Sequence, residues 1–319
     1  MDPQDWALIR ELEYDPRLSY QTLAKKFNVS PNTIKNRIKR MREQRMLGGG
    51  YAILSREMVG VEDIITVITT DGSEKGVELM QEIATQPSGC EIYRTGDRRY
   101  ELWAMVAGTS EALGLKKNLE NLASVIHVEM RPIYFVFPNM PPDYFMNTRG
   151  KKVNFSQKQL LVLRQLVESM RMPVTRIAQR TGITPRRVRK IISDLQWGGG
   201  VHLCNGYNIF ALGDIEYRLK IWWDPNQTTG PELATVIAEN YSDEFWWSSV
   251  TTNEPILDVG LIISDANQVV PIIREIKANP HITAFEDFVT YPRTAWPRNP
   301  LGRGLRKLLG LPELKPRSK

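Results

Sequence analysis

The sequence has few of the residues that build metal sites and disulfide frameworks. Its 319 residues include two cysteines, Cys90 and Cys204, and three histidines, His127, His202 and His281. Two cysteines cannot build a disulfide framework, and no group of cysteines and histidines has the spacing of zinc ligands. We therefore expect neither a structural metal nor a bound cofactor.

Long apolar segments and phosphate-binding glycine motifs are also missing. No window approaches 18 uncharged apolar residues, and the first ten residues, MDPQDWALIR, carry acids where a signal peptide needs a basic start and an apolar core. Neither GxGxxG nor the GxxxxGK motif occurs, so nothing indicates a nucleotide-binding loop. These absences predict a soluble, cytoplasmic protein with no membrane partner.

Charge is distributed unevenly along the chain, whose 42% hydrophobic and 24% charged residues are typical of globular domains. The net charge is +6, yet residues 151–200 alone carry 11 basic and two acidic side chains, a net charge of +9. Residues 1–50 carry +4 and residues 292–319 carry +7, so the other 191 residues carry −14. This partition predicts a polyanionic partner for particular elements, with solvated basic faces as the alternative.

The chain is similar to itself at an offset of 154 residues. A gapless match runs from about residue 5 to residue 41, and it preserves the apolar positions. The identical pairs include Arg10 and Arg164, Leu12 and Leu166, Arg17 and Arg171, Ala24 and Ala178, Pro31 and Pro185, and Ile38 and Ile192. The match resumes where Gly50-Tyr51 corresponds to Gly206-Tyr207, at an offset of 156. We interpret the chain as a tandem duplication of a unit of roughly 150 residues.

Each copy begins with a pattern of three short helices. In the first copy, Ser19 is placed to cap a second helix, and Ser30 with Pro31 starts a third helix that runs to about residue 45. In the second copy, Thr175 opens the second helix and Thr184 caps the third. The last two helices are joined by a short turn and the last one is basic, which indicates a helix-turn-helix.

The third helix of each copy carries the candidate DNA contacts. Ile34, Ile38 and Met41 form one apolar stripe, so the opposite polar side is free to face a DNA groove. Asparagine can bond adenine and arginine can bond guanine in the major groove, while lysines suit phosphates. The predicted DNA-binding residues are Ser30, Asn32, Thr33, Lys35, Asn36, Lys39 and Arg40 in the first copy and Thr184, Arg186, Arg187, Arg189 and Lys190 in the second. A solvated surface helix is the alternative.

A glycine run follows each third helix, at residues 48–50 and 198–200. Because glycines permit tight turns and a close approach to phosphates, we expect a β-hairpin wing after each helix-turn-helix. An ordinary linker is the alternative.

The remainder of each copy alternates strand and helix patterns. Residues 63–69, 75–86, 90–95, 100–107, 109–123 and 126–133 predict the order βαββαβ, and residues 217–223, 230–240, 244–250, 256–263, 266–278 and 282–289 repeat it. In the pairs Trp222-Trp223 and Trp246-Trp247, one indole faces away from the helices of its own copy. We expect these residues to pack two sheets together, with a stacking platform for nucleic-acid bases as the alternative.

The order of a basic winged helix-turn-helix, a glycine-tyrosine strand and βαββαβ resembles the Lrp/AsnC family of transcriptional regulators. The motifs that carry the resemblance are Leu23-Ala24, Val29-Ser30, residues 34–40, Gly50-Tyr51 and Thr95-Gly96-Asp97. It implies an α+β fold in which two winged helix-turn-helix domains alternate with two ferredoxin-like domains as an internal pseudo-dimer. The expected domains are residues 1–58, 59–136, 155–212 and 213–292, with a semi-extended linker at 137–154 and a basic tail at 293–319.

In the Lrp/AsnC family the regulatory sheets self-associate and hold an amino-acid effector, so the resemblance also implies further self-association. The family's effector loop usually reads Gly-x-x-Asp, whereas here Gly96 is followed by Asp97 and Arg98, and Arg99 stands at the acidic position. Residues 252–255 of the second copy keep neither the glycine nor the acid. These departures argue against amino-acid sensing, and they leave Gly96, Asp97 and Arg99 as candidates for a small-molecule effector of unidentified chemistry.

The leading interpretation is a sequence-specific transcriptional regulator, and not an enzyme, that uses two unlike recognition helices from one chain on double-stranded DNA. A low-specificity, chromatin-like DNA binder is one alternative. Siroheme decarboxylases, which resemble the same two-part unit, are another. Their strand similar to residues 93–103 has histidines around it, which this stretch lacks.

Overall fold

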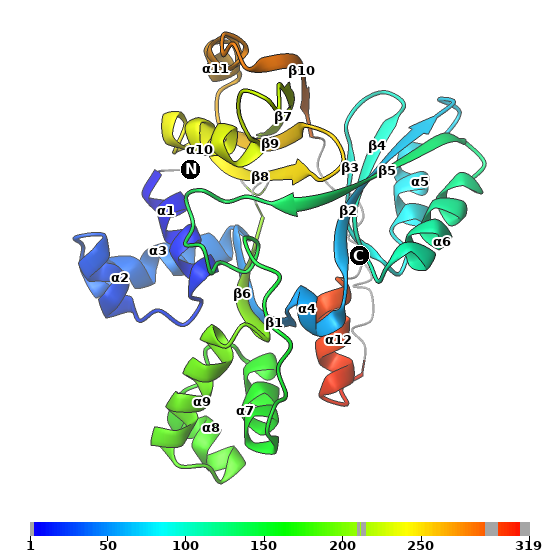
Figure 1. The fold of residues 1–319 in the computed structure, drawn as a ribbon. Coiled ribbons are helices and arrows are strands. Elements are labelled where there is room, and N and C mark those ends of the chain that lie inside the picture. Colours follow the sequence, from blue (N-terminus) through cyan, green and yellow to red (C-terminus); the bar gives the residue numbers. More distant parts are fainter. Residues whose placement is uncertain (1–2, 209–210, 212–214, 291–298, 313–319) are drawn as a thin grey trace. The chain divides into compact units, whose positions relative to one another are not determined.

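The chain folds into two units, and each draws on both halves of the sequence. The computed structural model describes residues 3–208, 211, 215–290 and 299–312 (Figure 1). The first unit, here called the helical unit, comprises Met1–Gly60, Arg149–Ala211 and Leu301–Lys319. The second, here called the sheet unit, comprises Val61–Thr148 and Leu212–Pro300.

The helical unit contains two groups of three helices. Its elements are α1 (Pro3–Tyr14), α2 (Tyr20–Lys26), α3 (Pro31–Glu43), β1 (Leu47–Leu54), α4 (Arg56–Val59), α7 (Gln157–Glu168), α8 (Val174–Thr181), α9 (Pro185–Trp197), β6 (Val201–Tyr207) and α12 (Pro300–Leu308). The predicted caps of α2 and α3 are confirmed, because Ser19 and Ser30 each accept a hydrogen bond of 3.0 Å from a backbone amide of the first turn. The predicted start of α8 at Thr175 is wrong, since the helix already begins at Val174 after Pro173.

The second helix-turn-helix has a continuous apolar core. Val162 and Leu166 of α7, Ile177 of α8, and Val188 and Leu195 of α9 are all buried in one cluster. Leu305 and Leu309, in and just after α12, join the same cluster. Part of the predicted basic tail thus forms a helix that packs against this core, while residues 293–298 and 313–319 of the tail lie outside the described residues.

The expected hairpin wings are wrong. β1 pairs with β6 in a two-stranded antiparallel sheet, with Tyr51 opposite Cys204 and Ile53 opposite His202. Each strand therefore satisfies the backbone groups of a strand about 150 residues away instead of turning back on itself. The first glycine run lies inside β1, where a Cβ on Gly50 would stand 2.5 Å from the Cβ of Met170. These glycines allow close packing and do not form a turn.

A reciprocal pair of arginines joins the two helical groups. Arg17 donates hydrogen bonds to the carbonyl oxygens of Met170 and Met172, and Arg171 donates to those of Pro16 and Leu18. The donors and the acceptors correspond at the same offset of 154 residues. The pKa of each guanidinium group is lowered, mainly because the group is partly buried. The identity at positions 17 and 171 thus has a structural role at the contact between the two groups.

The sheet unit contains two consecutive βαββαβ patterns, as predicted. Its elements are β2 (Glu62–Thr70), α5 (Gly76–Ile83), β3 (Gly89–Arg94), β4 (Arg99–Val106), α6 (Thr109–Glu120), β5 (Val125–Phe135), β7 (Ile215–Trp223), α10 (Gly230–Asn240), β8 (Phe245–Thr251), β9 (Ile256–Ile263), η2 (Ala266–Gln268), α11 (Val269–Lys277) and β10 (Ile282–Val289). The strands form one sheet in the order β10-β7-β9-β8-β5-β2-β4-β3. The protein is therefore a mixed α+β fold with antiparallel sheets.

The two patterns meet along a short strand pair and across one sheet face. Residues 133–135 of β5 pair with residues 249–251 of β8, which makes the sheet continuous. In β7, Leu219 and Ile221 pack with the helices of their own pattern, so the alternate residues Arg218 and Lys220 lie on the other face. The two patterns were expected to pack as separate sheets; they contact each other within one continuous sheet, and the face that makes the contact is charged as well as aromatic.

The start of the predicted linker is folded and is not a semi-extended spacer. Residues 138–147 form consecutive turns, in which Asn147 accepts a hydrogen bond of 2.7 Å from the amide of Phe137. The buried ring of Tyr144 packs edge-on against Phe137, with 5.2 Å between ring centroids. Aromatic burial in this segment outweighs the extended tendency of its prolines.

Candidate nucleic-acid interface

The first candidate recognition helix, α3, presents a polar face to solvent. Ile34, Ile38 and Met41 are buried against the helical unit, as the sequence predicts. Of the predicted DNA-binding residues on this helix and at its cap, Thr33 is half-buried and the following six are exposed: Ser30, Asn32, Lys35, Asn36, Lys39 and Arg40. The structure thus brings the predicted residues together on one accessible surface.

Acidic side chains pair with three cations in the carboxyl-terminal half of α3. Asp5 of α1 is buried and accepts hydrogen bonds from Arg37 at 2.8 Å and from Arg40 at 2.5 Å. Lys39 lies 3.7 Å from Glu43, one turn further along the helix. Arg40 is therefore held against the protein by a partner that the sequence analysis did not identify. The sequence did not indicate that Asp5 pairs with α3, because the distance between Asp5 and Arg40 depends on how α1 packs.

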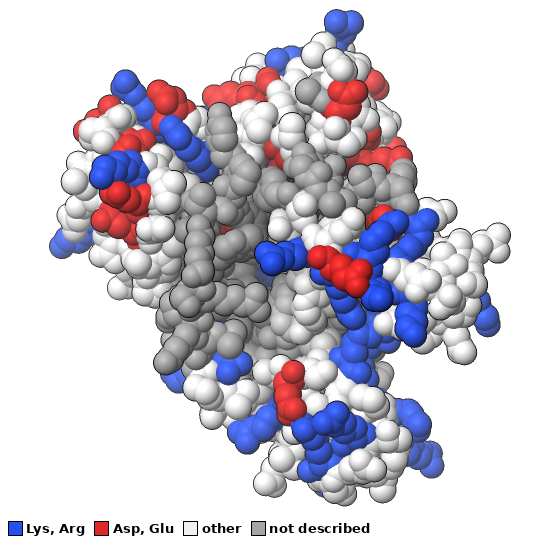
Figure 2. Space-filling view, turned by 180° about the vertical axis from the view of Figure 1, so that it is seen from behind, with Lys and Arg blue, Asp and Glu red and all other residues white. Residues whose placement is uncertain are grey.

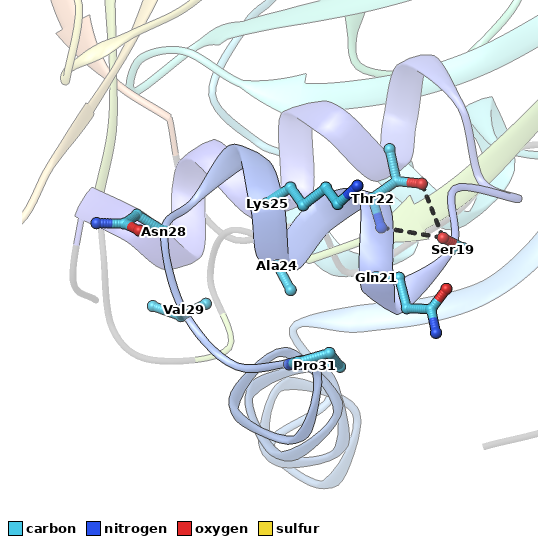
Figure 3. Close-up of a pocket in the computed structure, with 8 residues that line it drawn as sticks. All are labelled: Ser19, Gln21, Thr22, Ala24, Lys25, Asn28, Val29 and Pro31. Carbon is cyan, nitrogen blue, oxygen red and sulfur yellow. Dashed lines mark hydrogen bonds between the residues drawn. The ribbon is translucent and has the colours of Figure 1, made fainter.

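A surface pocket of about 660 Å³ lies beside the turn between α2 and α3 (Figure 3). Its lining residues come from the end of the loop before α2, from α2 itself and from the turn: Ser19, Gln21, Thr22, Ala24, Lys25, Asn28, Val29 and Pro31. Asn28 has a φ of 51°, a left-handed conformation that asparagine tolerates. This residue lets the chain turn sharply enough to place Pro31 at the first position of α3.

The second candidate recognition helix, α9, carries unpaired cations at its amino-terminal end. Arg186, Arg187 and Arg189 are exposed and make no ion pair with any residue that the structure describes. Lys190 lies 3.1 Å from Asp194, one turn further along the helix, so this predicted DNA-binding residue is paired with an acid. Thr184 is exposed at the cap position but makes no capping hydrogen bond.

The basic surface extends beyond α9 over the rest of the second helix-turn-helix. Figure 2 shows Lys and Arg side chains crowding the lobe at the bottom of the view, where Figure 1 places α7–α9. The exposed cations of this group include Lys151, Lys152, Lys158, Arg164, Arg176 and Arg180. Of these, Arg180 pairs with Glu168 at 2.6 Å, an exposed pair whose hydrogen bond lowers the pKa of the glutamate. The charge excess found in residues 151–200 is therefore presented to solvent.

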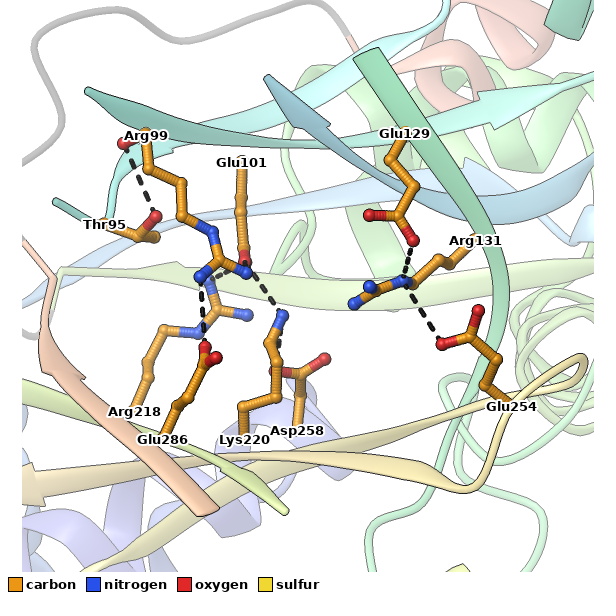
Figure 4. A network of polar contacts seen from close by, with 10 residues as sticks. All are labelled: Thr95, Arg99, Glu101, Glu129, Arg131, Arg218, Lys220, Glu254, Asp258 and Glu286. Atoms are coloured by element: carbon orange, nitrogen blue, oxygen red, sulfur yellow. Dashed lines mark hydrogen bonds and ion pairs between the residues drawn. The ribbon is translucent and has the colours of Figure 1, made fainter. Parts of the chain in front are cut away.

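The candidate effector residues do not converge on one site. Gly96 and Asp97 lie in the loop between β3 and β4, where Asp97 is almost fully exposed and pairs with Arg94 at 3.5 Å. Arg99 begins β4 and reaches Glu286 of β10, with 3.0 Å between the nitrogen and the oxygen. The arginine at the position where the family has an acid is thus engaged in an ion pair between the two βαββαβ patterns (Figure 4).

A buried ionic cluster on the sheet was not predicted from the sequence. The carboxylate of Glu101 on β4 lies 2.9 Å from Lys220 and 3.0 Å from Arg218, both on β7 (Figure 4). Lys220 also lies 3.4 Å from Asp258 of β9, and all four side chains are at most 3% exposed. Burial tends to raise the pKa of Glu101, but the attraction of Lys220 and Arg218 outweighs it and lowers that pKa to about 2. The cluster joins the two βαββαβ patterns.

Aromatic rings surround the guanidinium of Arg218. Its central carbon lies 4.7 Å from the ring centroid of Trp247 and 5.0 Å from that of Tyr93. The indole of Trp247 donates a hydrogen bond of 2.8 Å to Glu216. Trp247, one of the four tryptophans singled out in the sequence, therefore packs on a buried charge at the contact between the two patterns and is not an exposed stacking surface.

Neither a metal-binding group nor a membrane-spanning helix is found in the part of the chain that the structure describes. His127 lies in β5, His202 in β6 and His281 just before β10. Among the described residues, no three histidine, cysteine, aspartate or glutamate side chains form a metal-binding group. No helix in the described ranges is long and apolar enough to cross a membrane.

Comparison with known proteins relates the chain to transcriptional regulators. Residues 1–42 match the AsnC-type helix-turn-helix domain. The HTH-type transcriptional regulator Ptr1 of Methanocaldococcus jannaschii is 22% identical over 176 residues, which span 54% of this chain and 99% of that protein. An uncharacterized HTH-type transcriptional regulator of Pyrococcus furiosus is 39% identical over 62 residues, 19% of this chain and 42% of that protein.

A solved structure shares the fold over almost the whole chain. The siroheme decarboxylase NirDL, in complex with an iron-uroporphyrin III analogue, superposes with a TM-score of 0.60 over 96% of this chain and 97% of its own. The two sequences are 10% identical, so this similarity concerns the fold alone. The match to residues 1–42 confirms the resemblance found in the sequence. The chain has an AsnC-type helix-turn-helix at its start and is similar over about half of its length to a transcriptional regulator.

Proposed function

We propose that the protein is a sequence-specific regulator of transcription that binds double-stranded DNA through its helix-turn-helix elements. The observation that carries this proposal is the exposed and unpaired set Arg186, Arg187 and Arg189 at the start of α9. In a helix-turn-helix, the amino-terminal residues of the second helix contact base edges, and arginine bonds guanine through two atoms at once. The AsnC-type match and the name of the relative Ptr1 support the same function.

We also propose that the chain arose by tandem duplication and works as an internal pseudo-dimer. The reciprocal hydrogen bonds of Arg17 and Arg171 support this proposal, because equivalent donors reach equivalent acceptors. The pairing of β1 with β6 supports it as well. In this arrangement residues 1–58 and 155–212 supply the helix-turn-helix domains, and residues 59–136 and 213–292 supply the ferredoxin-like domains.

DNA titration at two salt concentrations tests the regulatory function. The purified protein is titrated with the duplex upstream of its own gene and with a random duplex of equal length. If six or so phosphates are contacted, the affinity should fall by about a thousand-fold or more between roughly 50 and 200 mM salt. Tighter binding to its own upstream duplex at the higher salt supports a regulator, whereas equal and salt-labile binding supports a low-specificity binder. No binding to either duplex contradicts both.

The fold shared with NirDL supports a second candidate, a tetrapyrrole-binding protein of the siroheme decarboxylase type. The distribution of His127, His202 and His281 over separate strands and loops argues against it, since none lies in residues 93–103. The test is a titration with iron uroporphyrin followed by visible absorbance. Saturable binding with a shifted absorption band supports the tetrapyrrole candidate, and an unchanged spectrum contradicts it.

A further inference from the structure

The two helix-turn-helix elements differ in charge at equivalent positions. At the offset of 154 residues, Asn32, Thr33, Lys35 and Asn36 of α3 correspond to Arg186, Arg187, Arg189 and Lys190 of α9. Further along, Lys39 and Arg40 correspond to Ser193 and Asp194. The cations of α9 thus lie at its amino-terminal end, where a helix-turn-helix meets base edges, and those of α3 lie mainly at its carboxyl-terminal end.

The cations of the two helices also differ in their intramolecular partners. Asp5, which is buried, holds Arg37 and Arg40 of α3 at 2.8 and 2.5 Å. A DNA phosphate would have to compete with this carboxylate, which α1 fixes in place. Arg187 and Arg189 of α9 have no such competitor among the residues that the structure describes. Their charges are therefore fully available to a polyanion.

The surroundings of the two helices reinforce this difference. Residues 151–200 have a net charge of +9, against +4 for residues 1–50. In the second group both acids, Glu168 and Asp194, are already paired with Arg180 and Lys190. Because the field of a whole surface steers a charged ligand, DNA meets a stronger attraction at α7–α9 than at α1–α3.

We propose that α9 is the dominant DNA-binding element and occupies the major groove of one guanine-containing half-site, while α3 contributes little to affinity. The proposal rests on the proposed function and adds to it that the two elements are unequal. It assigns the main contact to the part of the chain that lies outside the AsnC-type match at residues 1–42. The DNA site is then dominated by one half instead of being a palindrome with two equal halves.

Two triple variants of the full chain, each removing three exposed cations, test the proposal. R186A/R187A/R189A changes α9, and K35A/K39A/R42A changes α3 as the control with matched charge. All six side chains are exposed, so both variants should keep the wild-type circular dichroism and thermal midpoint. Fluorescence anisotropy measures binding to the upstream duplex and to a random duplex over a series of salt concentrations.

The α9 variant should bind the upstream duplex at least about ten-fold more weakly than the wild type. The slope of the logarithm of the binding constant against the logarithm of the salt concentration should become smaller in magnitude by about 2 to 3. The α3 variant should change the affinity less than about three-fold. Substituting 7-deazaguanine in the upstream duplex, which removes the N7 acceptor, should weaken wild-type binding but not that of the α9 variant. Equal losses in both variants, or a larger loss in the α3 variant, would overturn the proposal. Either of these results would still agree with DNA binding as the proposed function. A wild-type protein that binds neither duplex would contradict the proposed function itself.

Discussion

Removing the charge of Glu101 should destabilise the protein by about 3 kcal/mol. The carboxylate is fully buried and lies 2.9 Å from Lys220 and 3.0 Å from Arg218. Glu101→Gln keeps the size of the side chain but leaves the two buried cations with insufficient negative charge around them. Removing one partner from a buried ion pair costs about 3 to 5 kcal/mol, because the remaining charge stays out of water.

The lowered pKa of Glu101 indicates the pH range in which this stabilisation is lost. It is lowered from 4.5 to about 2 in the folded protein, so the unfolded chain binds the proton more readily. The stabilisation is therefore complete above pH 4.5 and is lost as the pH falls toward 2. A lowered pKa and a cost for removing the carboxylate have the same sign, because both follow from the attraction of Lys220 and Arg218.

Urea unfolding followed by tryptophan fluorescence measures the effect at pH 7 and at pH 3. Glu286→Gln is the matched control, because Glu286 also pairs with an arginine but is 50% exposed, and its loss should cost less than about 1 kcal/mol. The difference between the wild type and Glu101→Gln should shrink by about 2 kcal/mol at pH 3. A Glu101→Gln variant as stable as the wild type at pH 7, or a difference that does not change with pH, would refute the reasoning.

Three further perturbations test other parts of the structure. Arg17→Ala and Arg171→Ala should each destabilise the helical unit by about 1 to 3 kcal/mol in urea unfolding, because each leaves two carbonyl groups unpaired, and unequal effects would argue against equivalent roles. Gly150→Ala should lower the thermal midpoint, since φ is +77° and the new Cβ would lie 2.3 Å from Ser55, whereas Gly114→Ala in α6 meets nothing within 4 Å and should stabilise by about 1 kcal/mol. Asp5→Asn should release Arg37 and Arg40 and raise DNA affinity about five-fold in an anisotropy titration, and an unchanged affinity would show that Asp5 does not compete with DNA.

Local features of the helices could be predicted from the sequence. Ser30 followed by Pro31 marks the start of α3 with a side-chain cap and a residue that needs no amide hydrogen, so the helix begins there regardless of its surroundings. Apolar periodicity likewise predicted the buried stripe at Ile34 and Ile38. Both signals depend on residues a few positions apart in the chain.

Contacts between distant strands could not be predicted in the same way. A glycine run permits either a tight turn or a close approach of another segment. The residues Gly48–Gly50 therefore do not indicate that β1 pairs with β6. Glu101 stands between the buried residues Tyr100 and Leu102 in the sequence. No local pattern indicates that Lys220 of another strand neutralises it. Asp5 was missed for the same reason, since α1 brings it to Arg40 only in the folded unit.

The buried ionic cluster makes the two βαββαβ patterns unlike each other where they meet. Strand register places Val67 beside Glu101 in the first pattern and Lys220 beside Asp258 in the second. If two first patterns from different molecules paired in the same way, each Glu101 would be buried against valine in place of lysine, with the desolvation cost of an under-neutralised carboxylate. The charges therefore favour pairing of a first pattern with a second one over pairing of two identical patterns.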